Sequence, residues 1–270
     1  MARGLFMDKP VLLKLGGSLI TDKGRYETPR LDMLDNLVDE IHEARMEGNL
    51  RMVVGHGGGS FPHRAASEYE TQKGVSGKDS YRGIALVQDA AARLNRLIVK
   101  SLLDAGENAI SIQPSACMVT EGGLITDGFL KPVERALDFG MIPVPYGDVA
   151  FDMKIGCSII STERILSFIA RKVGASRIVI AANEEGVWED FPRKTKLIEE
   201  ITPRNFPQVK KHLKGSAEVD VTGGMLHKVE RMLGLSQETG ADVVIINGGA
   251  PGRLRDALLG KKVVGTIVRG

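Results

Sequence analysis

The chain has 270 residues, of which 43% are hydrophobic, 26% charged and 5% aromatic, and its formal net charge is +2 at pH 7. This composition excludes a disordered chain and is typical of a soluble globular protein with one large α/β domain or two smaller ones. Because the chain has neither a basic run with interleaved aromatic residues nor a stretch of roughly 18 apolar residues, we expect a cytoplasmic protein that binds neither nucleic acid nor membrane.

Short apolar runs alternate with longer segments of helical period along the chain. We predict strands at residues 11–15, 52–55, 109–112, 141–145, 177–181, 243–246 and 263–268, and helices at 31–47, 79–105, 161–173, 224–239 and 253–259. Strands that are apolar on both faces are typical of a largely parallel sheet covered by helices. We also predict a hairpin at 118–126 and a smaller one that joins 186–188 to 197–199. Cys117 and Cys157 match neither a zinc site nor a disulfide framework, so we expect free thiols.

The first predicted strand runs into a glycine-rich turn, Gly16-Gly17-Ser18. Glycine lets backbone amides approach an anion closely, and a following helix adds its positive N-terminal end, so this segment predicts a phosphate-binding cradle. Lys14 lies inside the apolar strand, which favours a charge directed into the turn over an idle surface lysine. Lys23 fits a phosphate contact and a solvated side chain equally well. We call residues 14–23 the first cradle.

The second predicted strand is followed by another glycine-rich turn, Gly57-Gly58-Gly59-Ser60. His63 falls in the first turn of the helix expected next, where its imidazole can point back over the glycines, so we predict it as a phosphate ligand. His56 competes for this role, but as the last residue of the strand we expect it to be buried and structural. We call residues 57–63 the second cradle, and two cradles so close in the sequence suggest that two phosphates meet.

Further candidates lie later in the chain. Asp148 follows an apolar strand in a Gly-Asp turn, and we expect it to face the ligand crevice beyond the carboxyl ends of the parallel strands. The segment 220–228 is a third glycine turn that opens a helix, with Gly224 and Lys228 on the same helix face. Several cradles, three lysines and no nucleophile–base pair predict phosphoryl transfer, which depends on positioning and charge neutralisation. The chain has no Walker motif or His-Arg-Asp loop, so we expect a different kinase architecture.

Taken in order, these motifs resemble those of the amino acid kinase superfamily and, within it, the isopentenyl phosphate kinases. The matching segments are Lys14-Leu-Gly-Gly-Ser18 with Thr21-Asp-Lys23, His56-Gly-Gly-Gly-Ser-Phe-Pro-His63, Gln113-Pro-Ser-Ala116, Tyr146-Gly-Asp-Val149, Asp220-Val-Thr-Gly-Gly-Met225 with Lys228, and Asn247 with Pro251-Gly-Arg253. The resemblance implies an α/β fold, an open αβα sandwich with a mainly parallel central sheet. It also implies an acceptor-binding N-terminal lobe (1–174), an ATP-binding C-terminal lobe (175–270) on one continuous sheet, and a homodimer.

The resemblance implies a role for each matching residue as well. His63 would hydrogen-bond the phosphate that the acceptor already carries, together with the amides of Gly57 and Gly58. Lys14 would bridge the transferring phosphoryl group, while Lys23 and Lys228 would hold the ATP phosphates. ATP with Mg²⁺ would be the donor, and we predict no metal-binding cluster of protein side chains. The other residues that the resemblance places at ATP are Gly16, Gly17, Ser18, Gly59, Asn183 and Gly224. Those expected at the acceptor are Asp148, Gly156, Ile84 and Val87. Ile84 and Val87 would form walls of an apolar slot beside the 118–126 hairpin.

The chain departs from the family pattern at two places. Pro62 stands where the family usually has glycine, which removes an amide donor near the acceptor phosphate, although proline is tolerated in the first turn of a helix. Asn183 replaces an aspartate near the nucleotide. The main expectation is an ATP-dependent isopentenyl phosphate kinase. The alternatives are a fosfomycin-type phosphonate kinase, which shares the histidine after Ser-Phe, and a non-catalytic nucleotide-binding protein.

Overall fold

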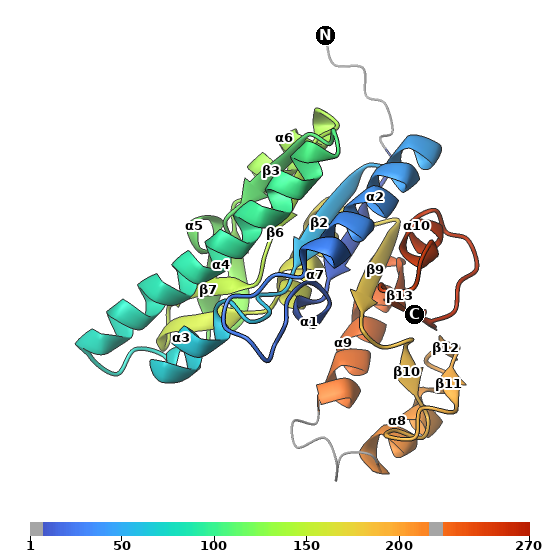
Figure 1. Cartoon of the computed structure of the whole chain (residues 1–270). Coiled ribbons are helices and arrows are strands. Elements are labelled where there is room, and N and C mark those ends of the chain that lie inside the picture. Colours follow the sequence, from blue (N-terminus) through green and yellow to red (C-terminus); the bar gives the residue numbers. More distant parts are fainter. Residues whose placement is uncertain (1–7, 216–223) are drawn as a thin grey trace.

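The central sheet is mainly parallel, with six strands in the order β12-β14-β13-β9-β1-β2. The computed structural model describes residues 8–215 and 224–270 (Figure 1). β1 is parallel to its neighbours β2 and β9, and β9 is parallel to β13, whereas β14 runs antiparallel to β13. The bounds are Val11–Leu15 (β1), Met52–His56 (β2), Arg177–Ala182 (β9), Glu200–Ile201 (β12), Asp242–Asn247 (β13) and Thr266–Val268 (β14).

Smaller sheets lie around this one. A bridge between His56 and Tyr146 connects the end of β2 to the chain directly after β6, which is itself parallel to β3. A four-stranded sheet has the order β5-β4-β7-β8, and β10 and β11 form an antiparallel pair. Both predicted hairpins are therefore confirmed. The bounds are Ala109–Ile112 (β3), Met118–Glu121 (β4), Leu124–Gly128 (β5), Ile142–Pro145 (β6), Asp148–Asp152 (β7), Gly156–Ile160 (β8), Val187–Trp188 (β10) and Leu197–Ile198 (β11).

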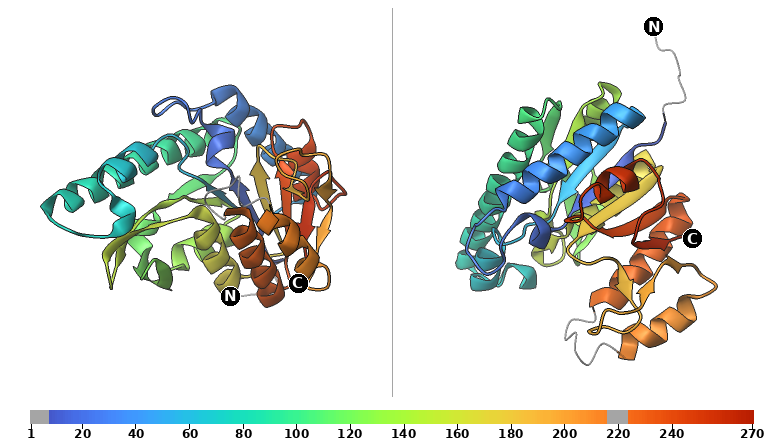
Figure 2. Two further views of the ribbon diagram at one scale, coloured as in Figure 1. Left: turned by 90° about the horizontal axis from the view of Figure 1, so that it is seen from below. Right: turned by 45° about the vertical axis from the view of Figure 1, so that its right-hand side comes forward.

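Helices cover both faces of the central sheet (Figure 2). Side chains alternate along β1, so that Val11, Leu13 and Leu15 pack into one buried cluster with α2, α4 and α10, while Leu12 packs into another with α6, α7, α8 and α9. The predicted fold, an open αβα sandwich with a mainly parallel sheet, is confirmed. The main helices are Leu31–Gly48 (α2), Lys78–Asp104 (α4), Lys131–Asp138 (α6), Thr162–Val173 (α7), Phe206–Gly215 (α8), Gly224–Thr239 (α9) and Arg253–Leu258 (α10).

Short helices complete the described part of the chain. They are Gly17–Ile20 (α1), His63–Glu68 (α3), Pro114–Cys117 (α5) and the 3₁₀ turn Thr71–Lys73 (η1). Cys117 and Cys157 are free, as expected. Within residues 8–215 and 224–270, we find no helix with the length and apolar character needed to cross a membrane.

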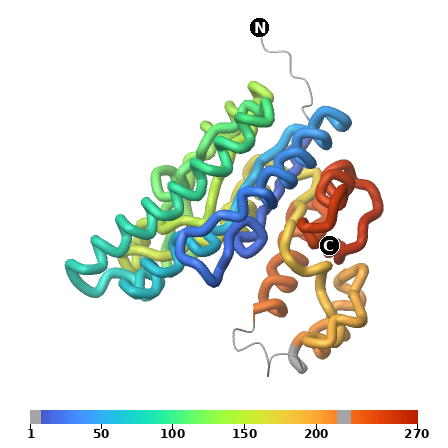
Figure 3. The backbone as a smooth tube through the Cα atoms, viewed as in Figure 1, coloured from blue at the N-terminus to red at the C-terminus, as the bar shows by residue number. Residues whose placement is uncertain are grey.

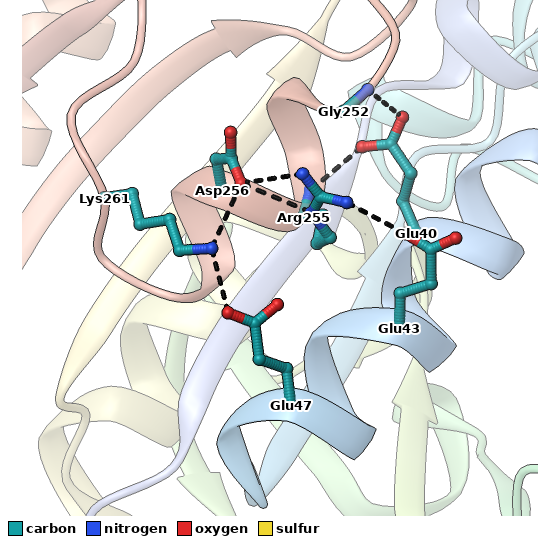
Figure 4. A network of polar contacts seen from close by, with 7 residues as sticks. All are labelled: Glu40, Glu43, Glu47, Gly252, Arg255, Asp256 and Lys261. Atoms are coloured by element: carbon teal, nitrogen blue, oxygen red, sulfur yellow. Dashed lines mark hydrogen bonds and ion pairs between the residues drawn. The ribbon is translucent and has the colours of Figure 1, made fainter.

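The side chain of Glu40 in α2 hydrogen-bonds the start of α10. Helices α2 and α10 lie side by side, although about 200 residues separate them in the chain (Figure 3). Glu40 of α2 accepts hydrogen bonds from the backbone amides of Gly252 at 2.7 Å and Arg255 at 2.9 Å, at the start of α10 (Figure 4). The first amides of a helix have no partner within the helix, so a carboxylate there both hydrogen-bonds and favours the helix dipole. Arg255 also reaches Glu43 at 3.4 Å.

The backbone contacts of Glu40 predict a measurable loss of stability on truncation. Glu40→Ala leaves two helix-terminal amides without their partner, so we expect the free energy of unfolding to fall by about 1–2 kcal/mol. The matched control is Glu43→Ala, which removes only an exposed ion pair and should cost about 0.5 kcal/mol or less. Urea unfolding of both variants at pH 7 measures the difference, and equal losses would contradict the capping role.

His56 joins β2 to β6 and is fully buried, as expected. Its ring stacks on that of Tyr146 with the centroids 5.6 Å apart. Burial lowers the pKa of His56 to about 4, so the ring is neutral at pH 7. Nδ1 then donates to the carbonyl oxygen of Gly57 at 3.1 Å, and Nε2 accepts from the amide of Asn95, which also donates to the carbonyl of Val144. The imidazole thus holds the backbone at Gly57, where β2 passes into the second cradle.

The burial of His56 predicts how pH changes stability. The pKa of His56 is about 4 in the folded protein, below the ordinary value of 6.5. Between pH 6.5 and 4, His56 is therefore protonated in the unfolded chain but not in the folded protein. The stability contributed by the neutral ring is present above pH 6.5 and is lost as the pH falls toward 4. We expect the stability difference between the natural protein and His56→Gln to shrink by about 3 kcal/mol over this range. Urea unfolding at pH 7, 6, 5 and 4 measures it, and a difference that does not depend on pH would refute the assignment.

Candidate functional site

The two cradles meet backbone to backbone. β1 and β2 are paired so that Leu15 lies opposite His56, and each strand ends in its glycine turn at the same edge of the sheet. A Cβ atom on Gly17 would lie 2.4 Å from the amide nitrogen of Gly59, and one on Gly59, which has φ of +56°, would lie 2.1 Å from the Thr21 hydroxyl. Thr21 donates to the carbonyl of Gly17 and accepts from the amide of Ser60. Only glycine fits this contact, which brings both predicted anion sites together.

Lys14 is the fourth residue of β1, two positions before the first glycine of the first cradle, and is paired with Glu163. It follows Leu12 on the face of β1 that α7 and α9 cover, and its ammonium group forms an ion pair with Glu163 in the first turn of α7. Burial raises the pKa of Glu163, but the charge and hydrogen bond of Lys14 and the charge of Lys228 outweigh burial and leave the pKa below its usual value. Glu163 therefore keeps two of the predicted lysines, Lys14 and Lys228, around one negative charge.

Sequence reasoning missed Glu163. An acidic residue in the first turn of a helix is ordinarily explained by the helix dipole, so the sequence carries no signal for its pairing with a lysine 149 positions away. Sequence reasoning also missed its neighbour Thr162, because the contact that Thr162 makes is distant in the sequence. The Thr162 hydroxyl donates to the backbone carbonyl of His56 at 2.6 Å, which attaches the start of α7 to the end of β2.

Lys23 and His63 face one another across the second cradle. They line a pocket of about 450 Å³ together with Gly24, Arg25, Tyr26, Gly59, Ser60 and Arg64. Burial and, to a lesser extent, the charge of Lys23 lower the pKa of His63, so the imidazole is neutral at pH 7. Because none of the described residues that line this pocket is acidic, its charge suits an anion. Pro62 precedes the first residue of α3 with φ of −81° and ψ of −16°, which confirms that proline fits here.

The expectation that Asp148 faces an open crevice is wrong. Asp148 is fully buried, and its carboxylate accepts from the amides of Ser115 at 3.0 Å and Val149 at 2.9 Å. It begins β7 instead of ending a loop, and burial raises its pKa to about 6. The Gly-Asp pair is the start of an antiparallel strand, and the carboxylate anchors the short helix α5 to it.

The residues predicted as walls of an apolar slot lie together, although against different neighbours. Ile84 and Val87 pack into a small cluster with residues of α3, β7 and β8, namely Ala65, Ala66, Val149, Cys157 and Ile159. The predicted 118–126 hairpin lies beyond β7, since the strand order is β5-β4-β7-β8. Gly156 opens β8 with φ of +83°, and Gly122 and Gly123 of the hairpin tip donate to Asp152. The cluster therefore lies beside the helix that begins with His63.

The predicted nucleotide residues lie where β1, β9 and β13 end. Gly16 donates to the carbonyl of Ala181, and Asn183 donates to the carbonyl of Ser18 at 3.0 Å, so β9 holds the first cradle. Glu185 accepts from Asn247 and pairs with Arg253. Gly224 is the first residue of α9, whereas residues 220–223 of the third glycine turn lie outside the described part of the chain.

Comparisons with known proteins agree with this geometry. The model of the amino acid kinase family matches residues 9–247. The isopentenyl phosphate kinase of Methanothermobacter thermautotrophicus is 33% identical over 271 residues, which cover 96% of this chain and 99% of the relative. That of Methanocaldococcus jannaschii is 32% identical over 266 residues, which cover 95% of this chain and 97% of the relative.

Solved structures lead to the same family. An X-ray structure of an isopentenyl phosphate kinase superposes with a TM-score of 0.80 at 30% identity and covers 95% of this chain and 99% of that one. An isopentenyl phosphate kinase substrate complex superposes with a TM-score of 0.77 at 26% identity, over 97% of this chain and 100% of that one. The chain belongs to the amino acid kinase family and, within it, to the isopentenyl phosphate kinases.

Proposed function

We propose that this protein is a kinase that transfers the γ-phosphoryl group of ATP to isopentenyl phosphate and forms isopentenyl diphosphate. The observation that carries the proposal is the backbone contact of the two cradles at Gly17 and Gly59, with Lys14 beside one and His63 beside the other. Two anion sites in contact suit a reaction in which one phosphate attacks another. The relatives reported above are isopentenyl phosphate kinases, which supports the choice of acceptor.

The donor phosphates would lie on the first cradle. We assign the amides of Gly16, Gly17 and Ser18 to the transferring end of ATP, with Lys14 and Lys228 converging on it through their shared interaction with Glu163. Gly59 and Gly224 would leave space for the nucleotide chain, and Asn183 would hold the first cradle in place through Ser18. As the transition state develops negative charge on the transferred oxygens, fixed cations there lower the barrier.

The acceptor phosphate would lie on the second cradle. Neutral His63 can donate one hydrogen bond to it, and the amides of Gly57 and Gly58 can donate others. Lys23 was expected on the ATP phosphates, but it shares the pocket with His63, so we assign it to the acceptor side of the transfer point. The tail would run toward Ile84, Val87 and Gly156. The acceptor needs no general base, because its phosphate is already an anion at pH 7.

Magnesium would enter with ATP. Among the residues that the structure describes, no group of three or more His, Cys, Asp or Glu side chains is placed to hold a metal ion, so the phosphates themselves would supply the main ligands. The bound ion would neutralise charge on the donor phosphates. We propose further that residues 1–174 and 175–270 act as acceptor and ATP lobes, and that the protein is a cytoplasmic homodimer, for which Phe129, Phe151 and Met153 offer exposed apolar side chains.

Removal of Lys14 or His63 should affect different kinetic constants. In an assay that couples ADP release from ATP and isopentenyl phosphate to NADH oxidation, we expect Lys14→Ala to lower kcat by about 10²–10³-fold, because it removes a cation from the transferring group. His63→Ala should raise KM for isopentenyl phosphate by at least about tenfold, the loss of one hydrogen bond to a charged group. Lys100→Ala, which removes an exposed lysine paired with Asp104, is the control and should match the natural protein.

Two outcomes would count against this assignment. Full activity in both Lys14→Ala and His63→Ala would refute the mechanism. A higher kcat/KM for fosfomycin than for isopentenyl phosphate would favour the phosphonate kinase. Binding of ATP with no turnover on either acceptor would favour a nucleotide-binding protein.

Glu163 should act as a positioning residue. In Glu163→Gln the shared negative charge is lost and Lys14 and Lys228 repel each other, so we expect kcat to fall by at least about tenfold with KM for the acceptor nearly unchanged. Glu163→Asp keeps the charge and should recover part of kcat. Steady-state kinetics of both variants measure this, and equal kcat values for the Gln and Asp variants would show that charge is not what matters.

A further inference from the structure

A cavity of about 670 Å³ lies between α7 and α9, and the proposed reaction uses only one end of it. The two helices run side by side on one face of the sheet (Figure 2). Lys14, Glu163 and Lys228 form the end at the transfer point, and the ion pair of Arg171 with Glu238 marks the far end. The walls between the two ends are apolar and consist of Leu166, Phe168, Ile178, Ile180, Met232 and Leu235. From Lys228 to Glu238 the axis of α9 rises about 15 Å.

The end at the transfer point carries an excess of positive charge. Lys14, Lys228, Arg164 and Arg231 line it, and among the described residues the only acidic side chain there, Glu163, is paired with Lys14. Arg164 donates to the backbone carbonyl of Gly123, and burial followed by the charge of Arg231 lowers its pKa. Within residues 8–215 and 224–270, the Arg231 side chain forms no ion pair or hydrogen bond. Like charges that outnumber the acidic side chains beside them are typical of a site for an anion.

Gly234 keeps the cavity open. It lies in the middle of α9, where glycine is about 1 kcal/mol less favourable than alanine. A Cβ atom at this position would meet no described atom within 4 Å, so packing does not require glycine here. Since Gly234 lines the cavity, a side chain would occupy the space between the helices. Gly234 therefore makes α9 less stable than alanine would, at a position where a larger side chain would fill the cavity.

We propose that this cavity binds a phosphate or diphosphate ester of a long aliphatic chain, with the anionic head at Lys228 and Arg231 and the chain between α7 and α9. A chain that reaches Glu238 is much longer than the five carbons of the proposed acceptor. The proposal rests on the proposed function in one respect: a longer-chain relative of the product would then occupy charges that ATP needs and would inhibit the kinase. Binding itself does not depend on that reaction.

Calorimetry with farnesyl diphosphate as the probe tests the proposal without turnover. We expect saturable binding to the natural protein, with farnesol and inorganic pyrophosphate each at least tenfold weaker, since one lacks the head and the other the chain. ATP should compete with farnesyl diphosphate. Gly234→Leu places a branched side chain in the cavity and should weaken binding of farnesyl diphosphate at least tenfold. Gly234→Ala is the matched control, which should bind within about threefold of the natural protein and unfold at a higher urea concentration.

His63→Ala separates this cavity from the proposed acceptor site. If farnesyl diphosphate occupies the α7–α9 cavity, the affinity of His63→Ala should stay within about twofold of that of the natural protein. Loss of binding in His63→Ala together with full binding in Gly234→Leu would place the probe on the second cradle and overturn the proposal. No binding to the natural protein would also overturn it, whereas failure of the kinase assay alone would leave this binding result standing. Urea unfolding of Gly234→Leu checks that the variant is folded.

Discussion

The site depends on one close contact, the approach of the backbone at Gly17 to the backbone at Gly59. A side chain at either position would collide with main-chain atoms or with Thr21, so the two turns can meet only as glycines. Parallel pairing of β1 and β2 brings the turns to one edge, and Thr21 bonds both of them. Without this contact the two predicted anion sites would be separate. With it, they are neighbours, as the proposed transfer between two phosphates needs.

Charge balance is the second requirement. The cations around the cradles would repel each other and leave the site poorly defined in the absence of phosphate. Glu163, partly buried at the start of α7, counters this, since it pairs with Lys14 and also feels the charge of Lys228. At the second cradle, none of the described residues that line the pocket with Lys23 is a carboxylate, and burial keeps His63 neutral. The first cradle thus has one carboxylate among its cations, which only partly offsets their charge, while the described lining of the pocket at the second cradle has none.

The sequence was sufficient to predict the strands, the main helices and the two cradles, because their signals are local. Apolar runs that end in glycine turns indicate parallel strands whatever the rest of the chain does. The partners of these residues were not predictable: Glu163, Thr162 and Asn95 each act through a contact that only the folded chain creates. Asp148 was misplaced because a Gly-Asp pair after a strand fits a ligand loop and a buried strand start equally well.

The hydrogen bond from Thr162 to the carbonyl of His56 has a consequence for how this enzyme can diversify. It attaches the helix that carries Glu163 to the strand that ends in the second cradle, so the positions of the two are coupled. A mutation that shifts the end of β2 therefore also disturbs the start of α7, where Glu163 pairs with Lys14. Under the proposed function, a change in β2 that widens the acceptor site would slow turnover, whereas the proposed tail contacts Ile84 and Val87 lie in a separate cluster beside α3.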